Sequence, residues 1–284
     1  WGLGYFGGVG GLLLVLFGFV LADPPLFGLD ASERALEHIR ISGPIVALWL
    51  LLFCIPLFVW TRDPRGHGLA AGAAVRSGLA ELRTTLARLR QHPQLWRYLL
   101  ARMIFTDGLN TLFAFGGVFA AGTFGMPVAE VIMFGLILNV TAGAGAFVFG
   151  WVDDRIGAKR TILLGLCGLV IVGVPLLLVE SKLVFMVLGA VLGIFFGPVQ
   201  AASRSLMARI TPAGMAGEMF GLYALSGKAT AFVGPWMVAL ITALTGSQRW
   251  GMASVLPFLV VGGVLLWLTV RDVPPERSIA PGSR

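Results

Sequence analysis

The chain has 284 residues, of which 57% are apolar and 12% are charged, and its formal net charge is +7. Soluble domains carry about 25% charged residues, so this composition excludes an ordinary soluble domain and indicates several membrane-spanning helices. The positive charge does not indicate a nucleic-acid-binding protein, because the basic residues lie mainly between apolar runs, where they set membrane topology.

Residues that commonly hold metals or take part in catalysis are few. The three His residues lie outside the apolar runs, whereas Cys54 and Cys167 lie inside them, where small packing residues are usual. The sequence contains neither a nucleotide-binding glycine loop nor a nucleophile elbow. We therefore expect no cofactor, no metal site and no enzymatic activity.

The apolar runs predict an all-α integral membrane protein. A helix needs about 20 apolar residues to cross a bilayer. Because Trp1 lies only a few residues before an apolar run, we expect an N-terminal part of the protein to be missing. The predicted spans cover approximately residues 4–22, 43–60, 98–122, 127–152, 161–179, 183–207, 219–244 and 251–270.

The first two spans form a segment, residues 1–60, that precedes a long basic linker, residues 61–97. Gly7 and Gly11 have the spacing at which helices pack closely. From Val75 onward, leucines recur at helical spacing between arginines, which predicts an amphipathic helix on the membrane surface. A calmodulin-type target helix is the alternative interpretation of this pattern.

The distribution of basic residues predicts the orientation. Fourteen of the 21 Lys and Arg residues fall on one side of the predicted membrane, four on the other and three within spans. Short cytoplasmic loops are rich in Lys and Arg, so the linker and the tail, residues 273–284, are expected to be cytoplasmic. The six spans of residues 98–272 then form one bundle. If the protein is bacterial, the membrane is the plasma (inner) membrane.

A charged stretch, residues 150–160, joins the fourth and fifth spans, and we expect about eight polar residues to link the two helices. Gly157 can adopt a left-handed turn without steric cost. Asp154 is expected to pair with a basic group or with a helix N-terminus. The basic residues that mark this stretch as cytoplasmic are Arg155, Lys159 and Arg160.

Glycines inside the spans predict close helix contacts. Gly150 is expected to let a neighbouring helix approach. A ladder at four-residue spacing favours close contact or bending of the sixth span, and it consists of Gly189, Gly193 and Gly197. Pro198 follows directly and predicts a break there, since it frees backbone groups that neighbours or water must satisfy.

Ionisable groups within the spans are the first candidates for a functional site. Such a group costs about 2.5–3.5 kcal/mol at mid-bilayer, so it usually faces a cavity or a partner. Asp107 and Lys228 each lie about 13 Å deep at 1.5 Å per residue, and we hypothesise that they face a central cavity and pair. A pair that only fixes helix packing is the alternative. Arg102 lies near the end of its span and is expected to extend to the membrane surface.

Neutral polar residues extend this set. Asn110 lies one turn beyond Asp107, and Asn139 lies midway along the fourth span. Together they suggest a solute pathway. The predicted residues for substrate binding or ion coupling are Asp107, Asn110, Asn139, Gln200, Arg204 and Lys228.

The pattern G-x-x-x-D-R-x-G-x-K-R of residues 150–160 resembles the signature loop of the Major Facilitator Superfamily, which lies on the cytoplasmic side between the second and third helices of each half. By this resemblance, six residues belong to the conformational signature: Gly150, Asp154, Arg155, Gly157, Lys159 and Arg160. Three further stretches resemble the vacuole effluxer-like branch of that superfamily: residues 106–111, 197–205 and 220–228.

The resemblance covers nearly the whole chain and implies twelve helices in two six-helix bundles that work by alternating access. The chain would then hold the last two helices of the first bundle and the complete second bundle, with about four helices missing. The fungal members of the branch are linked to efflux of amino acids from the vacuole, which implies a similar solute here.

We therefore expect a secondary active transporter of a small polar solute, with amino acid efflux as the specific hypothesis. Asp107 would bind a coupling proton or a solute amine, and Lys228 and Arg204 would bind an anionic group. The expected partners are the lipid bilayer, the solute and a coupling ion, with no nucleic acid. A non-transporting membrane receptor or assembly subunit with the same fold is the alternative, although polar residues at mid-depth favour transport.

Overall fold

The computed structural model describes residues 2–22, 26–29, 37–61, 71–89, 91–212 and 214–272. All regular secondary structure in these ranges is helical. The predicted tail, residues 273–284, and residues 62–70 of the linker lie outside the described residues. The chain divides into two units: residues 7–88, and residues 1–6 together with 89–284.

The unit of residues 7–88 contains most of the first predicted span and all of the second, and both spans are long and apolar enough to cross a membrane. Gly10 and Gly11 face the ring of Trp49, since a Cβ added to Gly10 would lie 3.5 Å from that ring. Gly7, which was predicted to pack closely, faces open space instead. The helices are α1 (Gly2–Val15, begun in the other unit), the π-helical turn η1 (Leu16–Val20), the short 3-10 turn η2 (Leu26–Gly28), α2 (Glu37–Arg40), α3 (Ser42–Trp60) and α4 (Ala71–Leu89).

The linker contains the helix α4, and its predicted amphipathic character stays a prediction. Arg76 and Arg83 are exposed along it, and Val75 is exposed as well. Its placement on a membrane surface stays a prediction.

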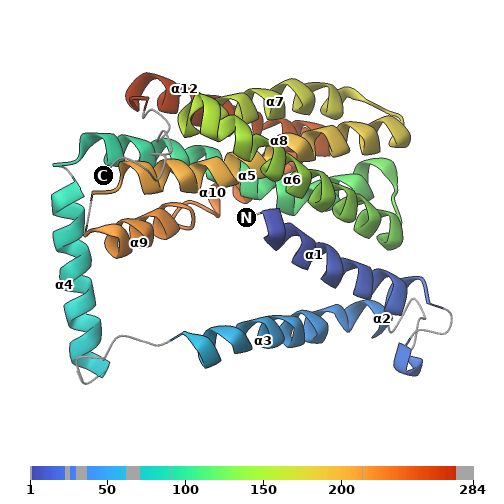
Figure 1. Cartoon of the computed structure of the whole chain (residues 1–284). Coiled ribbons are helices and arrows are strands. Elements are labelled where there is room, and N and C mark those ends of the chain that lie inside the picture. Colours follow the sequence, from blue (N-terminus) through green and yellow to red (C-terminus); the bar gives the residue numbers. More distant parts are fainter. Residues whose placement is uncertain are drawn as a thin grey trace, which may run out of the picture. The chain divides into compact units, whose positions relative to one another are not determined.

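The larger unit is a bundle in which α8 packs between α6 and α7, while α12 packs along α5 and α7 (Figure 1). Large buried side chains fill its core, among them Tyr98, Phe105 and Met207. The helices are α5 (Pro93–Phe124), α6 (Val128–Ile156), α7 (Ala158–Leu178), α8 (Lys182–Ile210), α9 (Ala216–Ser226), α10 (Val233–Thr245), α11 (Gln248–Ala253) and α12 (Leu256–Thr269).

Seven helical segments among the described residues are long and apolar enough to cross a membrane, which confirms every predicted span but one. The predicted continuous span of residues 219–244 is wrong, because turns at residues 227–232 separate α9 from α10. Pro235 supplies a physical reason. It has no N–H for the carbonyl of Ala231, and its ring would clash with that carbonyl in a continuous helix. Residues 227–232 are called the break below.

Glycines bring α6 and α8 into backbone contact, as the ladder predicted. A Cβ on Gly197 would overlap the carbonyl oxygen of Ala142, and one on Gly193 would overlap the hydroxyl of Thr141. The expectation for Gly150 is wrong, because a Cβ there would meet nothing within 4 Å. A glycine of α6 that does allow close approach is Gly145, where a Cβ would overlap the carbonyl oxygen of Ile194.

The predicted break at Pro198 is also wrong, since α8 continues from Lys182 to Ile210. Pro198 removes the usual donor only from the carbonyl four residues earlier, which belongs to Ile194. That carbonyl faces Gly145 of α6. The helix therefore continues through the proline, because close packing against α6 holds the freed carbonyl in place.

Candidate functional site

Two neighbouring cavities in the larger unit collect most of the predicted site residues. The first, with a volume of about 600 Å³, is called the amide cavity. The second, with a volume of about 350 Å³, is called the cation cavity. Asn110 of α5 and Gln200 of α8 line both cavities, so the two spaces adjoin along these side chains.

The amide cavity is lined mainly by α5, α6 and α8, together with the first turn of α1, which belongs to the same unit. Asn139 donates its Nδ2 hydrogen to the carbonyl of Gly135 at 2.8 Å, which leaves its Oδ1 atom available to a solute. The Tyr5 hydroxyl donates to Gln200 Oε1 at 3.2 Å. The lining residues are Gly4, Tyr5, Asn110, Phe113, Ala114, Asn139, Phe196 and Gln200.

The cation cavity lies between α5, α8 and the break. Arg204 of α8 and Lys228 of the break line it with exposed side chains, and Arg102 contributes from α5. Among the described residues that line either cavity, none is Asp or Glu. The site therefore combines neutral amides with positive charge, an arrangement that favours a solute with an anionic group.

Arg102 is a site residue that the sequence analysis misjudged. Its side chain does not extend to the membrane surface, because Nη1 donates hydrogen bonds to the Tyr223 carbonyl at 2.7 Å and to Ser226 Oγ at 2.8 Å. The guanidinium carbon also lies 3.5 Å from the centre of the Tyr223 ring. The Tyr223 carbonyl lies in the last turn of α9, where a helix carries partial negative charge, which explains why α9 attracts this cation.

Asp107 does not line either cavity, and it is only 2% exposed. Its Oδ2 atom accepts a hydrogen bond from the backbone N–H of Gly234, at 3.1 Å, in the first turn of α10. The hypothesised pair with Lys228 is not formed in the described part of the chain. The reason is the break, which creates a helix N-terminus whose unpaired N–H groups favour a carboxylate.

The signature stretch is more compact than expected. Helix α6 ends at Ile156 and α7 begins at Ala158, so one residue, Gly157, separates them instead of about eight. Gly157 has φ 91° and ψ 153°, so its φ lies in the positive region that favours glycine, but its ψ is extended and not that of the predicted left-handed turn. The remaining polar residues of the stretch belong to the two helix ends.

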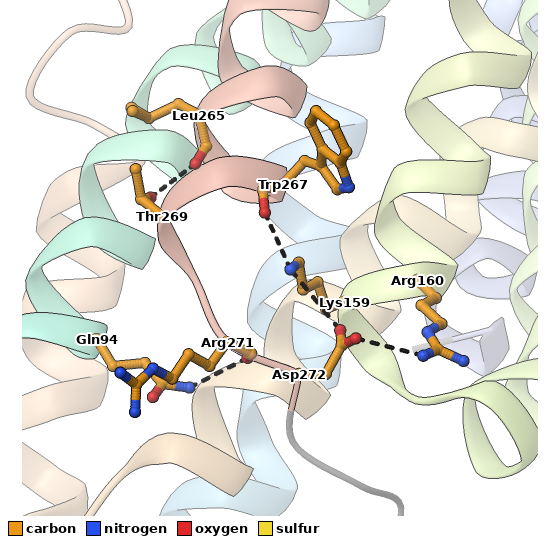
Figure 2. A network of polar contacts seen from close by, with 8 residues as sticks. All are labelled: Gln94, Lys159, Arg160, Leu265, Trp267, Thr269, Arg271 and Asp272. Atoms are coloured by element: carbon orange, nitrogen blue, oxygen red, sulfur yellow. Dashed lines mark hydrogen bonds and ion pairs between the residues drawn. The ribbon is translucent and has the colours of Figure 1, made fainter.

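The basic residues of this stretch hold the end of α12 (Figure 2). Lys159 Nζ donates to the Trp267 carbonyl at 3.1 Å and lies 3.8 Å from Asp272 Oδ1. Arg160 Nη2 lies 3.4 Å from Asp272 Oδ2. Gln94 of α5 also reaches this region, because its Nε2 atom donates to the carbonyl of Arg271 at 3.2 Å. The network therefore joins the starts of α5 and α7 to the chain that leaves α12.

The pairing with a basic group that was expected of Asp154 is formed by its neighbour Asp153 instead. Asp153 is buried, and its Oδ1 atom lies 3.0 Å from Nη1 of Arg209 near the end of α8. The orientation of these two groups is that of an ion pair and not of a hydrogen bond. Asp154 and Arg155 are exposed. Asp153, and not Asp154, therefore lies on the face of α6 that packs on α8.

A solved structure of a bacterial homologue of the human lysosomal transporter Spinster, inward-facing and unoccupied, is similar to this chain with a TM-score of 0.53. The identity is 15%, and the match covers 93% of this chain and 64% of the other. Together with the family and the relative described next, this similarity shows a multi-pass membrane protein with the all-α bundle of the Major Facilitator type, whose members are transporters and not enzymes.

Residues 1–273 match the family described as "Vacuole effluxer Atg22 like", and the chain belongs to that family. It is similar to the "Uncharacterized MFS-type transporter YxiO" of Bacillus subtilis (strain 168), with 27% identity over 98% of this chain and 62% of the relative. It is also similar to "Autophagy-related protein 22" of Cryptococcus neoformans var. neoformans (strain JEC21), with 26% identity over 91% of this chain and 47% of the relative. The chain therefore spans about half to three-fifths of the length of these relatives.

Proposed function

We propose that this chain forms the solute-binding wall of a secondary active transporter that moves a small polar solute by alternating access. The observation that carries this proposal is the pair of adjoining cavities, in which five of the six predicted site residues meet. Two findings support the proposal: one relative is named as an MFS-type transporter, and the chain matches a family described as vacuole effluxer-like. Polar residues at this depth are costly in a bilayer unless they face a solute or water.

An amino acid is the proposed solute. Its carboxylate would bind Lys228 and Arg204 in the cation cavity, and its polar groups would bind Asn110, Asn139 and Gln200. In the proposed orientation the signature stretch, residues 150–160, faces the cytoplasm, and transport is directed outward. Asp107 accepts a hydrogen bond from the first turn of α10 and lines neither cavity, so its predicted coupling role would have to act through α10. That role stays a prediction.

The test is counterflow of labelled amino acids in proteoliposomes that contain the full-length gene product. A hydrogen bond to a charged group contributes about 1.5–3 kcal/mol, so Lys228→Gln should raise the KM for the transported solute about 10- to 100-fold. Arg76→Gln is the matched control, because it removes one positive charge from an exposed position on α4. The control should transport like the wild type.

Two results would contradict the proposal. If no amino acid exchanged at all, the proposed solute would be wrong, and a wider panel of small carboxylates should be tested next. If none of these exchanged or bound, the receptor or assembly-subunit alternative would replace transport.

A further inference from the structure

We infer that Arg102 and Asp107 of α5 are positioning residues. They bind the two helix ends on either side of the break and thereby place the side chain of Lys228 in the cation cavity. These two residues are called the clasp below. The importance of Lys228 rests on the proposed function, but the clasp itself rests on geometry. The inference assigns both buried charges of α5 to one task, whereas the sequence suggested separate roles for them.

The break is a short segment with its own hydrogen-bond pattern. Lys228 N donates to the Leu225 carbonyl at 3.0 Å, and Ala231 N donates to the Lys228 carbonyl at 3.2 Å. These two bonds join residues three apart, whereas Ala229 N donates to the Leu225 carbonyl at 2.8 Å, four residues back. The segment therefore mixes α-helical bonds with 3-10 bonds, whose geometry is poorer.

The two charges of α5 support this segment with the correct signs. Arg102 lies at the C-terminal end of α9, where a helix has partial negative charge, and Asp107 lies at the N-terminal end of α10, where a helix has partial positive charge. The two residues are five positions apart on α5, which corresponds to about 7.5 Å along its axis. Helix α5 therefore contacts both the end of α9 and the start of α10.

Glycines at both ends of the break let these side chains reach the backbone. A Cβ on Gly227 would lie 3.0 Å from both Nη1 and Nη2 of Arg102. A Cβ on Gly234 would overlap Thr111 Oγ1 and would lie 3.2 Å from Asp107 Oδ1. The guanidinium thus lies close to the space of a side chain at position 227, and Thr111 together with the Asp107 carboxylate leaves no room for one at position 234.

Two polar atoms of the clasp are buried without a hydrogen-bond partner among the described residues, namely Arg102 Nε and Asp107 Oδ1. Leaving such atoms unpaired is costly, so residues that only filled space would be better replaced by apolar ones. The charges are explained if their task is to hold an irregular backbone beside the cavity.

The experiment measures the accessibility of position 228 directly and does not depend on transport. In the full-length protein with Cys54→Ser and Cys167→Ser, Lys228→Cys is labelled with methyl methanethiosulfonate, a small neutral reagent. The labelling rate is then compared after addition of Arg102→Gln or Asp107→Asn. Ala243→Cys serves as the control reporter, since it lies near the far end of α10 and lines another cavity.

We expect each clasp variant to change the labelling rate at position 228 at least fivefold and to leave the rate at position 243 unchanged. Gly227→Ala is a milder second variant that should act in the same direction. Its matched control is Gly221→Ala, where a Cβ would meet nothing within 4 Å. An unchanged rate at position 228 in all three clasp variants would overturn the inference.

A variant that misfolds is recognised because labelling at position 243 changes too, and Gly227→Ala then decides the question. The proposed function fails separately: if position 228 responds to the clasp variants but the wild type exchanges no amino acid in the counterflow assay, the clasp stands and the assigned solute site falls.

Discussion

The substitution Gly145→Ala tests how closely α6 and α8 pack in the wall that carries Asn139 and Gln200. A Cβ at position 145 would overlap the carbonyl oxygen of Ile194, which is backbone and cannot turn aside as a side chain could. The two helices would have to separate. Overpacking of this kind costs about 1–3 kcal/mol.

Gly150→Ala on the same helix is the matched control. Replacing Gly by Ala inside a helix stabilises it by about 0.5–1 kcal/mol, and this gain applies to both variants. At Gly150 nothing opposes it, because a Cβ there meets open space. The difference between the two variants therefore isolates the overpacking cost, about 1–3 kcal/mol.

The assay is reversible denaturation of the purified full-length protein in detergent micelles, followed by far-ultraviolet circular dichroism. Gly145→Ala should unfold more readily than Gly150→Ala, and the latter should be at least as stable as the wild type. If the two variants shifted stability equally, the close backbone contact between α6 and α8 would be refuted.

Two further predictions concern the signature stretch. Gly157→Ala should destabilise the protein by about 1–3 kcal/mol, because its positive φ and extended ψ suit only glycine; a melting temperature equal to the wild type would contradict the turn described here. A double-mutant cycle with Asp153→Asn and Arg209→Gln should give a coupling free energy of about 0.5–3 kcal/mol in the same denaturation assay, since these groups lie 3.0 Å apart, whereas additive effects would show that the pair contributes nothing.

Prolines show where prediction from the sequence succeeded and where it could not. The apolar runs located the helices, because the bilayer thickness fixes their length. The sequence analysis placed a break at Pro198 and none at Pro235, and the structure shows the reverse. Each proline frees one carbonyl, and the surroundings decide whether the helix continues. The carbonyl freed by Pro198 faces Gly145, whereas the helix ends on either side of the break bind charges of α5.

The site was predicted better than the contacts within it. Depth along each span identified Asn110, Asn139 and Lys228 as cavity residues, because depth follows from helical rise alone. Partner choice could not be predicted in the same way. Asp107 meets Gly234 instead of Lys228 because the break exposes the N–H groups of α10.

A similar limit applies to the adjacent acids of α6. Successive residues on a helix point about 100° apart, so Asp153 and Asp154 face different surroundings. Only the position of Arg209 on α8 determines which of them is buried.

The central claim, that the cation cavity binds the anionic group of a small solute, is tested most directly by solute-dependent thermal stabilisation of the full-length protein. A solute present at 100 times its Kd should stabilise the wild type by about 2.7 kcal/mol. The account predicts that Lys228→Gln loses most of this stabilisation at the same concentration, whereas Arg76→Gln retains it. Equal stabilisation of Lys228→Gln and the wild type by every binding solute would contradict the claim.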